Sequence, residues 1–415
     1  MRPAAILAAA VLLLPEIVTM HVALAEELVE KVVLYRAGQD GYQVCRIPGI
    51  VVTPKATILA YCEARRGNGD WGSIDILLRR GTLGGKTWSV PQKIAEAPLP
   101  HRKNPVSPVE KQGCPDDLTY NNPVAIADPV TGAIHFLFCL EYERCFYQRS
   151  DDDGVSFSPP VEITATFAEY RSQYDWKVLA TGPGHGVRLA SGRLIVPIWM
   201  SLATASHAHR PSAVSTIFSD DDGRSWQRGD IVANHGNLLA NPSEMAVVEL
   251  VDHRVMLNIR SESPQHRRAI AASPDGATRW TAPQFDPHLP EPICMGSLCR
   301  LSEERTQGKN RLLFANPNNL DREDGKQTPS VSRDRTNLTI RLSYDEGRSW
   351  ADSKTLEAGP SAYSDLAVGP DGTIYCFYER GRRGKDKTDG LPCLTLAKFN
   401  LEWLTDGKDR FATPK

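Results

Sequence analysis

Nine charged or hydroxyl-bearing residues, spread from residue 46 to residue 379, are of the types that bind anions and move protons. They are Arg46, Glu63, Arg65, Asp70, Glu244, Arg260, Arg335, Tyr363 and Glu379. Arginine presents planar, permanently charged donors that grip a carboxylate at two points, and carboxylic acids serve as general acids or bases. Taken singly, each has a plainer explanation, such as a surface arginine at Arg46 or a core aromatic ring at Tyr363. A shared function therefore requires a fold that brings them together.

The elements that would do so are marked by a repeated acidic octet. Its clearest copy is SDDDGRSW at residues 219–226, and related octets occupy residues 150–157 and 343–350. Weaker copies are GTLGGKTW at residues 81–88 and SPDGATRW at residues 273–280. Their final aromatic residues lie 69, 69, 54 and 70 residues apart, and each interval is rich in β-branched residues. A period of this size predicts one small β-sheet for each repeat.

The acidic octet does not fit a calcium-binding EF-hand loop. With Gly223 as the sixth residue of such a loop, the first and twelfth positions would be Phe218 and Gly229, which supply no side-chain ligand. The two other acidic copies fail in the same way. We interpret the octet as a turn in which Ser and Asp oxygens cap backbone N–H groups, Gly adopts a positive φ, and the aromatic ring packs beneath.

Each repeat is expected to contain a hairpin, a third strand that enters the acidic turn, and a fourth strand after it. The hairpins are expected at residues 49–62, 123–140, 186–200, 245–259, 297–315 and 364–378. The last repeat has no acidic turn, and we expect an isolated strand at residues 31–35 to complete it and close a ring. Six such units predict an all-β, six-bladed β-propeller with four antiparallel strands in each blade. A parallel β-helix fits less well, because its rungs are much shorter.

Strand direction sorts the connections between these strands. If the first strand of every blade begins at one rim, called the top rim, the acidic turns between strands three and four all lie at the opposite, bottom rim. The approach to strand one and the connection from strand two to strand three lie at the top rim. All nine residues named above occupy top-rim positions, so the propeller predicts that they converge near its axis.

Charge composition and the N-terminal segment indicate which class of partner is not favoured and in which compartment the protein is expected. The 48 basic and 50 acidic side chains give a net charge of −2 without a basic block, which does not favour nucleic acid as a partner. Arg2, an apolar run over residues 4–14 and Ala23-Leu24-Ala25 indicate a signal peptide over residues 1–25, so we expect a secreted or periplasmic protein. Residues 26–415 are expected to form one catalytic propeller domain without a membrane-spanning segment.

The nine cysteines lie mostly in apolar strands, where buried free thiols are the simplest interpretation. Export would allow disulfides, and the nearest pairs are Cys294 with Cys299 and Cys139 with Cys145, but an odd count leaves one thiol over. Metal-ligand spacing is absent, and two histidines, at residues 207 and 209, are too few for a metal site and are expected to be solvated. We therefore predict no metal and no cofactor.

Several motifs together resemble the propeller-type exo-sialidases (neuraminidases) of bacteria and animals, over nearly all of residues 30–405. In chain order they are Arg46-Ile47-Pro48, Tyr61-Cys62-Glu63-Ala64-Arg65, Asp70, Gly182-Pro183-Gly184-His185-Gly186, Ser243-Glu244, Asn258-Ile259-Arg260, Arg335-Thr336-Asn337-Leu338 and Ala362-Tyr363-Ser364-Asp365-Leu366. The acidic turns correspond to that family's Asp-boxes, or BNR repeats. An Asp-box alone is weak evidence, because many non-enzymatic propellers carry it, whereas the ordered arginine and tyrosine motifs are a strong signal.

The resemblance implies a catalytic centre built on a carboxylate clamp. Arg46, Arg260 and Arg335 would hold the carboxylate that a sialic acid carries on its anomeric carbon. Tyr363 would attack that carbon, since a neutral phenol is not repelled by the substrate carboxylate, and Glu244 would withdraw the phenol proton.

The resemblance also assigns the remaining acids and Arg65. Asp70 would protonate the leaving group and then activate water, which calls for a raised pKa in a partly closed loop. Its flanking glycines, Gly69 and Gly72, suit a mobile loop and equally suit an ordinary turn. Glu379 would pair with Arg46, and Glu63 with Arg65 would line the rim near the ring substituents of the sugar. Structural ion pairs would explain these last three residues equally well.

The function implied is that of a retaining exo-α-sialidase, which hydrolyses terminal sialic acid from glycoproteins, glycolipids and other sialylated glycans through a tyrosyl-enzyme intermediate. Two alternatives stay open: a propeller that binds sialoglycans without turning them over, and a glycosidase for a related 2-keto sugar acid. A binding protein needs only the arginines, so the joint presence of Asp70, Glu244 and Tyr363 favours an enzyme. The arginines alone do not separate the two sugar acids, which share the carboxylate.

Two long connections and two atypical octets complete the expectations. The connections at residues 95–121 and 164–184 reach the top rim, and aromatic residues of the second could stack on a sugar or pack over the gap between blades: Phe167, Tyr170, Tyr174 and Trp176. The insertion at residues 320–334 is a candidate lid. Leu83 replaces Asp in the first octet, and Ala277 and Arg279 stand for Gly and Ser or Thr in the fourth, which puts the stability of these two turns in doubt.

Overall fold

The computed structural model describes residues 29–107, 117–204, 207–236, 238–381 and 392–411. The predicted signal peptide lies outside these ranges. The described chain consists mainly of β-strands, with short α-helices α2 (Thr164–Ala168), α3 (Glu304–Gln307) and α4 (Leu401–Leu404) and a 3-10 turn at Leu83–Gly85. None of the helices in the described ranges is long and apolar enough to cross a membrane. An all-β fold is therefore confirmed.

Successive strands pair antiparallel in groups that follow chain order. The first group contains β2 (Val44–Val52), β3 (Ile58–Arg65), β4 (Ile74–Thr82), β5 (Thr87–Trp88) and β6 (Gln92–Lys93). The second contains β7 (Tyr120–Ala127), β8 (Ile134–Leu140), β9 (Arg144–Ser150) and β10 (Val161–Glu162). The third contains β11 (Val178–Thr181), β13 (Val187–Arg188), β14 (Leu194–Ser201), β15 (Ser212–Ser219), β16 (Gln227–Arg228) and β17 (Ala233–Asn234). The fourth contains β18 (Met245–Glu249), β19 (Val255–Ile259), β20 (Arg267–Ser273) and β21 (Gln284–Pro290).

The remaining strands form one continuous sheet instead of the two separate units that the sequence predicted. In sheet order they are β22 (Ser297–Ser302), β23 (Arg311–Pro317), β24 (Thr336–Ser343), β25 (Asp352–Val368), β26 (Ile374–Arg380), β27 (Cys393–Phe399) and β1 (Glu30–Arg36). The join is β25, whose first half pairs with β24 and whose second half pairs with β26. The predicted pairing of the N-terminal strand with the last strand is confirmed, because β1 lies antiparallel to β27.

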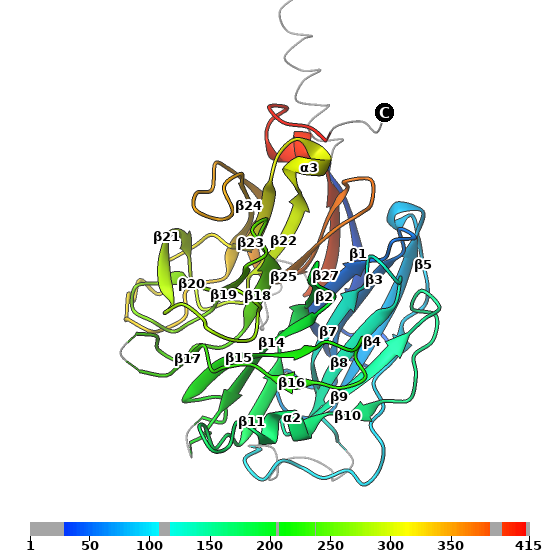
Figure 1. The fold of residues 1–415 in the computed structure, drawn as a ribbon, viewed down its shortest axis with the longest axis vertical. Coiled ribbons are helices and arrows are strands. Elements are labelled where there is room, and N and C mark those ends of the chain that lie inside the picture. The colour runs from blue at the N-terminus through cyan, green and yellow to red at the C-terminus, as the bar shows by residue number, and fades with distance from the viewer. Residues whose placement is uncertain (1–28, 108–116, 205–206, 237, 382–391, 412–415) are drawn as a thin grey trace, which may run out of the picture.

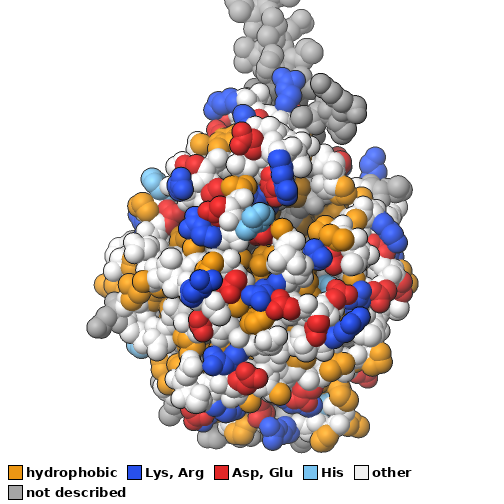
Figure 2. All heavy atoms as spheres, in the orientation of Figure 1, with side chains coloured by type: hydrophobic (Ala, Val, Ile, Leu, Met, Phe, Trp, Pro, Cys, Tyr) orange, Lys and Arg blue, Asp and Glu red, His pale blue; other side chains and the backbone are white. Residues whose placement is uncertain are grey.

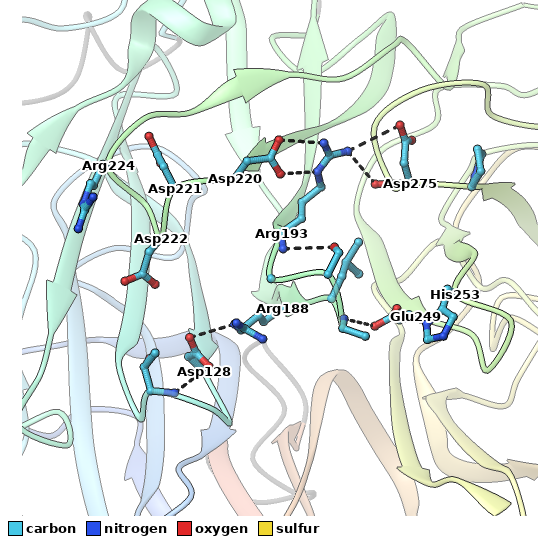
Figure 3. Close-up of a pocket in the computed structure, with 16 residues that line it drawn as sticks. Asp128, Arg188, Arg193, Asp220, Asp221, Asp222, Arg224, Glu249, His253 and Asp275 are labelled. Carbon is cyan, nitrogen blue, oxygen red and sulfur yellow. Dashed lines mark hydrogen bonds and ion pairs between the residues drawn. The ribbon is translucent and has the colours of Figure 1, made fainter. Parts of the chain in front are cut away.

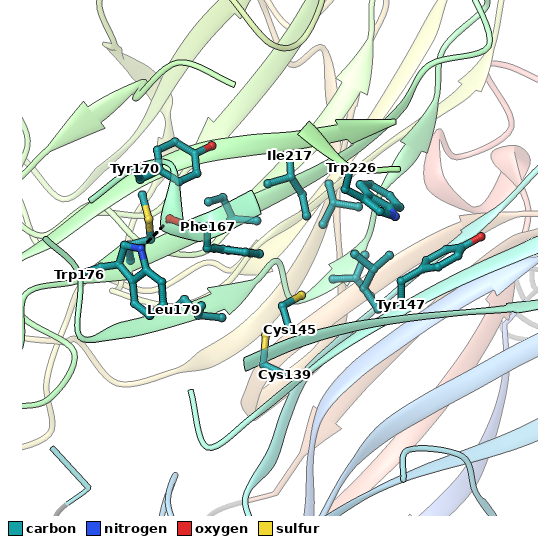
Figure 4. Close-up of a cluster of buried hydrophobic side chains, with 14 of the residues drawn as sticks. Cys139, Cys145, Tyr147, Phe167, Tyr170, Trp176, Leu179, Ile217 and Trp226 are labelled. Atoms are coloured by element: carbon teal, nitrogen blue, oxygen red, sulfur yellow. Dashed lines mark hydrogen bonds between the residues drawn. The ribbon is translucent and has the colours of Figure 1, made fainter. Parts of the chain in front are cut away.

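The core lies between successive groups, because a sheet whose strands are apolar on both faces must be covered on both. Strands β3 and β14 are buried at every position. The cluster in Figure 4 packs β8 and β9 against β14 and β15. It includes the four aromatic rings of the second long connection, which are all buried: Phe167, Tyr170, Tyr174 and Trp176. Of the two alternatives for these rings, packing over the gap between sheets is the correct one.

The groups are arranged around a common centre (Figure 1). There β2 contacts both β7 and β25, and β18 contacts both β14 and β22. The short strand β12 (Gly184–His185) lies parallel to β7, a pairing that the antiparallel scheme did not predict. Asp365 joins these central elements, since its carboxylate accepts hydrogen bonds from Ile50 N at 2.9 Å and Ser297 Oγ at 2.8 Å, and pairs with His185 Nδ1 at 2.8 Å.

The acidic octets are turns, as interpreted from the sequence. In the copy at residues 219–226, Gly223 N donates to Ser219 Oγ at 2.9 Å, and Ser225 N donates to Asp221 Oδ1 at 2.9 Å. Gly223 has φ 84°, and the ring of Trp226 is buried beneath the turn. The copies at residues 150–157 and 343–350 repeat the same hydrogen bonds. Each turn therefore satisfies its own backbone donors.

The fourth octet keeps this turn by a shift of one residue, which the sequence comparison did not anticipate. Gly276, and not Ala277 at the position expected for glycine, adopts the positive φ, which is 73°. The N–H of Gly276 donates to Ser273 Oγ. Thr278 takes the Ser or Thr role, because its backbone N–H and hydroxyl both donate to Asp275. The side-chain hydrogen bonds of the turn are therefore kept despite Ala277 and Arg279, in a turn that is one residue shorter than the others, although Arg279 adopts φ 53°.

Eight cysteines lie in the described residues, and all eight are free thiols. Cys139 and Cys145 stand directly opposite each other on β8 and β9 without a bond between them. The ninth, at residue 114, is outside the described residues. On the face shown in Figure 2, acidic and basic side chains alternate among apolar ones, in line with the small net charge.

Candidate active site

Seven of the nine residues that we singled out line one cavity of about 250 Å³: Arg46, Arg65, Asp70, Glu244, Arg260, Arg335 and Tyr363. The other two lie behind it. Glu63 is fully buried and holds Arg65, and Glu379 holds Arg46. Counting strands therefore predicted which side chains meet, although residues 46 and 363 are far apart in the chain.

Strand ends position these side chains. Arg46 lies near the start of β2, opposite Glu63 near the end of β3. Glu244 immediately precedes β18 and Arg260 immediately follows β19, and the backbone N–H of Arg260 donates to the carbonyl of Glu244. Tyr363 lies within β25. Because antiparallel neighbours begin and end at the same edge, the side chains of several sheets meet at one rim.

Tyr363 is the centre of the densest hydrogen-bond network. Its hydroxyl lies 2.6 Å from Glu244 Oε1 and 2.8 Å from Glu244 Oε2, and it accepts a hydrogen bond from Arg260 Nη1 at 2.7 Å. Arg260 also forms an ion pair with Glu244. Burial raises the pKa of the phenol and outweighs the lowering by Arg260. The phenol is therefore protonated at neutral pH and has a carboxylate in place to take its proton.

The three candidate clamp arginines surround the Tyr363 ring. The guanidinium carbons of Arg46 and Arg335 lie 5.1 Å and 5.2 Å from the ring centroid, and Arg260 contacts the hydroxyl. Arg46 pairs with Glu379, with Nε 3.0 Å from Oε1. Arg335 donates to the carbonyl of Ile293 at 2.7 Å and has no carboxylate partner among the described residues. The guanidinium of Arg335 is therefore available to a carboxylate of a ligand.

Asp70 lies at the mouth of the cavity with half of its side chain exposed. Arg65 Nη1 is 2.7 Å and Arg46 Nη1 is 3.5 Å from Asp70 Oδ1. Burial would raise the pKa of this carboxyl, but Arg65 and Arg46 outweigh burial and hold the pKa below its ordinary value. The raised pKa that we expected for Asp70 is therefore wrong for the ligand-free protein, since two guanidinium groups stabilise the carboxylate.

The wall of the cavity that faces the arginines was not predicted from the sequence as part of the site. Its residues are Tyr142, Trp199, His207, His209, Arg210, Asn241 and Glu262. Tyr142 follows β8 and Trp199 lies near the end of β14, so both follow the second strand of a group and belong to the top rim. The same strand count places both residues at this rim, yet Tyr142 was overlooked, and Trp199 was not considered because it carries neither a charge nor a hydroxyl group. His209 was expected to be solvated, yet its ring packs against Trp199 with centroids 5.3 Å apart.

Three buried polar atoms of this wall have no hydrogen-bond partner among the described residues: Trp199 Nε1, His209 Nε2 and Asn241 Oδ1. The orientation of Asn241 is fixed, because its Nδ2 donates to Glu262 Oε2 at 2.7 Å and a carboxylate only accepts. Its oxygen must therefore face away from Glu262. A polar ligand that fills the cavity would satisfy these atoms, which are costly to leave unpaired.

A larger cavity, of about 1,040 Å³, lies at the opposite rim among the acidic turns (Figure 3). It contains none of the nine residues. At its edge, ligand atoms of Asp128, His135 and Asp222 lie within 4.8 Å of one another, a grouping suited in type to a metal ion. The two carboxylates are paired with Arg188 and Arg149, and burial lowers the pKa of His135 to about 4. The negative charge is therefore already compensated within the protein.

The top-rim cavity thus combines four chemical capacities. It can hold a carboxylate between arginines, activate a phenol through Glu244, exchange a proton at Asp70, and pair neutral polar groups along the opposite wall. These groups together suit a ligand that carries a carboxylate and neutral polar groups.

Comparison with known proteins agrees with this description. Residues 57–376 match the family model described as a BNR repeat-like domain. The chain is 28% identical to a sialidase of Micromonospora viridifaciens over 389 residues, which are 88% of this chain and 53% of that protein. It therefore spans about half the length of this bacterial relative. It is 30% identical to rat sialidase-2 over 356 residues, which are 81% of this chain and 89% of the rat protein.

Among solved structures, a leech intramolecular trans-sialidase in complex with 2,7-anhydro-Neu5Ac superimposes with a TM-score of 0.69 at 18% identity, covering 91% of this chain and 71% of the leech chain. At that identity the likeness concerns the fold. The family model covers most of the chain, and the curated relatives are sialidases of bacteria and mammals. The chain therefore belongs to the sialidase family with BNR, or Asp-box, repeats.

Proposed function

We propose that this protein is a retaining exo-α-sialidase, a glycoside hydrolase that removes terminal sialic acid from glycoproteins, glycolipids and other sialylated glycans. The observation that carries the proposal is the environment of Tyr363. A buried phenol has both oxygens of Glu244 within hydrogen-bonding distance and three arginines around it. A protein that only binds sialoglycans would need the arginines but not the base.

The first step would form a covalent bond between Tyr363 and the anomeric carbon. The arginines Arg46, Arg260 and Arg335 would hold the substrate carboxylate, and Glu244 would take the phenol proton as the oxygen attacks. The bond to the leaving-group oxygen would break, and Asp70 would give that oxygen a proton. Because burial raises the pKa of Tyr363, proton transfer to Glu244 would accompany attack and would not precede it.

The second step would reverse the first with water. Asp70, now ionised, would take a proton from water, which attacks the anomeric carbon, and Glu244 would return a proton to the released Tyr363 oxygen. Two displacements at one carbon give retention of configuration. Asp70 must enter the first step protonated. A substrate carboxylate would neutralise part of the charge of Arg46, and the leaving group would shield Asp70 from water, so both effects would raise its pKa on binding.

We further propose that the sheets form a closed six-bladed propeller with four strands in each blade. The pairing groups around one centre, the contacts of β2 with β7 and β25, and the completion of the last group by β1 support this closure. We also propose that residues 1–25 are removed on export to the periplasm or the exterior. N-terminal sequencing of the mature protein tests that proposal: an N-terminus near residue 26 is expected, and an intact Met1 in the exported protein contradicts it.

Turnover of an aryl α-sialoside, followed by ¹H NMR of the product, tests the proposed function. We expect the α-anomer of free sialic acid to appear first and to mutarotate afterwards. Release of the β-anomer first contradicts a retaining mechanism. A 2,7-anhydro product would identify an intramolecular transferase, and binding without turnover would identify a lectin.

The nucleophile is tested separately by trapping. A sialyl fluoride with fluorine at C3 slows both steps, because the fluorine destabilises the positively charged transition state. We expect intact-protein mass spectrometry to show one added 3-fluorosialyl group, and peptide mapping to place it on Tyr363. Labelling at another residue would overturn the assignment of the nucleophile while leaving hydrolase activity intact.

A further inference from the structure

The loop that carries Asp70 connects β3 to β4 and is attached to the protein on both sides of that residue. Before it, the carbonyl of Gly69 accepts a hydrogen bond from Arg65 Nη1 at 2.9 Å. After it, Gly72 N donates to Thr119 Oγ1 at 2.9 Å, and the Thr119 hydroxyl donates to the Gly72 carbonyl at 2.8 Å. Gly72 has φ 125°, a conformation that favours glycine. Of the two alternatives for the glycines that flank Asp70, Gly72 therefore fits a hydrogen-bonded turn.

Trp71, the residue next to Asp70, contacts aromatic rings of two other sheets. Its ring centroid lies 4.6 Å from that of Tyr142 and 5.9 Å from that of His209, with an interplanar angle of 29° to the His209 ring. Offset and stacked rings at these separations attract each other beyond simple burial. Trp71 is thus docked onto a surface formed by other sheets.

That surface is itself cross-linked by ring contacts. His209 lies 4.9 Å from Tyr142 and 5.3 Å from Trp199 between ring centroids, and Tyr142 lies 6.1 Å from Trp199. Tyr142 lies between β8 and β9, Trp199 on β14, and His209 between β14 and β15. Burial lowers the pKa of His209 to about 4, so its ring is uncharged near neutral pH and acts by packing.

We infer that Trp71, held by Tyr142 and His209, is a positioning residue that fixes Asp70 where the leaving-group oxygen is protonated. The inference rests on the proposed function. Asp70 is half exposed, and Arg65 and Arg46 both contact the same oxygen, Oδ1, so these ion pairs alone do not fix the orientation of the carboxyl group. A shift of about 1 Å in a catalytic group costs on the order of 100-fold in rate.

The test compares two leaving groups, because only one of them needs the acid. The leaving group of an aryl sialoside is a phenolate, which is stable without a proton. The leaving group of sialyllactose is lactose, which would depart as an unstable alkoxide unless an acid protonates it. For Trp71→Ala we expect kcat/KM to fall about 50-fold or more with sialyllactose and about fivefold or less with the aryl sialoside, by analogy with loss of general-acid catalysis. Asp70→Asn should show the same pattern more strongly.

A matched control is Trp88→Ala, on β5 of the same sheet but at the acidic-turn rim. It should change kcat/KM for the two substrates by the same factor. His209→Phe keeps a planar ring at residue 209, whereas His209→Ala removes it. If the packing of this ring against Trp71 holds Asp70 in place, His209→Phe should retain at least about fivefold more activity on sialyllactose than His209→Ala.

Equal losses on both substrates with Trp71→Ala would overturn the inference and assign Trp71 to binding or folding. If Trp71→Ala does not fold, as judged by thermal melting, Trp71→Phe carries the test, and the same preference for loss on sialyllactose is expected at about fivefold. If the unmodified protein turns over neither substrate, the proposed function itself is wrong, and this result is distinct from a failure of the Trp71 inference. A wild-type protein active on both, with no leaving-group difference in the variants, refutes only the positioning role.

Discussion

The two rims of this protein solve different problems with the same residue types. At the acidic-turn rim, Asp221 caps the turn in which it lies, and equivalent aspartates do the same at residues 152 and 345. At the other rim, the carboxylate of Glu244 contacts Arg260 and Tyr363, which is 119 residues away in the chain. The acidic-turn rim contains repeated contacts within single turns, whereas the other rim contains one cluster of side chains contributed by several sheets.

The difference extends to the contacts between neighbouring sheets. The acid at the fourth position of two turns pairs with an arginine of the preceding sheet, Asp153 with Arg80 and Asp222 with Arg149. In a third turn the equivalent Glu346 pairs with Arg300 of its own sheet. Loss of one copy leaves the others intact. No second copy of the Tyr363 network exists in the described residues, so function should be fragile at the top rim and stability should be graded at the bottom rim.

Replacement of Tyr363 by Phe tests this contrast most severely. We expect kcat/KM on an aryl sialoside to fall by at least about 1,000-fold, because the nucleophile is lost, while thermal stability changes little. Tyr378→Phe is the matched control. The hydroxyl of Tyr378 also donates a hydrogen bond to a buried carboxylate, that of Glu357 at 2.7 Å from Oε2, but lies outside the cavity. The control should lower stability and leave kcat/KM unchanged. Comparable losses of activity in both variants would contradict the distinction between the two tyrosines.

Replacement of Arg335 by Lys should have the next largest effect. Its guanidinium has no carboxylate partner among the described residues, so it is available for a substrate carboxylate, and lysine cannot supply the two-point contact. We expect KM to rise about 30-fold with a smaller change in kcat. Arg193→Lys, at an exposed bidentate pair with Asp220 of the bottom rim, should leave KM unchanged. An unchanged KM in Arg335→Lys would remove this residue from the clamp.

Replacement of Asp221 by Ala should affect stability and not catalysis. The lost hydrogen bonds to Ser225 are expected to lower the free energy of unfolding by about 1 kcal/mol, while kcat/KM of the folded protein stays within about twofold. The pKa of Asp221 is lowered to about 2, chiefly by Ser225, so its stabilisation is present above about pH 4 and is lost as pH falls toward 2. Urea unfolding of the wild type and the variant at pH 7 and pH 3 measures the loss of stability and its dependence on pH. A large loss of activity at unchanged stability would contradict the separation of the rims.

The smallest effect is expected at the centre, where His185 pairs with Asp365. Burial lowers the pKa of His185, but the carboxylate of Asp365 outweighs it and raises the pKa above its ordinary value. The pair therefore stabilises the fold fully below about pH 6.5, and this contribution is lost as pH rises through the raised pKa. His185→Gln should flatten the decline of stability above neutral pH without changing the slope near pH 3. An identical decline in the variant would show that another group titrates there.

Much of the site could be predicted because strand counting depends on local patterns. The period of the acidic octets and the alternation of apolar residues sufficed to place Arg46, Asp70 and Tyr363 on one rim. The fusion of two units through β25 was not predicted, because Gly359-Pro360 in the middle of β25 is typical of a turn that ends a strand, whereas here the strand continues through it. The one-residue shift in the fourth turn was missed for a related reason, since Thr278 acts through geometry and not through its place in the octet.

The sequence by itself determined the kinds of element, their order, the rim on which each loop lies, and the family to which the chain belongs. These depend on turn chemistry and hydrophobic alternation, which are local. Only the tertiary structure decided that Trp71 docks on Tyr142 and His209, that Glu63 lies buried behind Arg65, and that Asp70 is held ionised by two arginines. Ring packing and pKa values depend on the distances and burial of groups from different sheets, and no single stretch of sequence contains those distances.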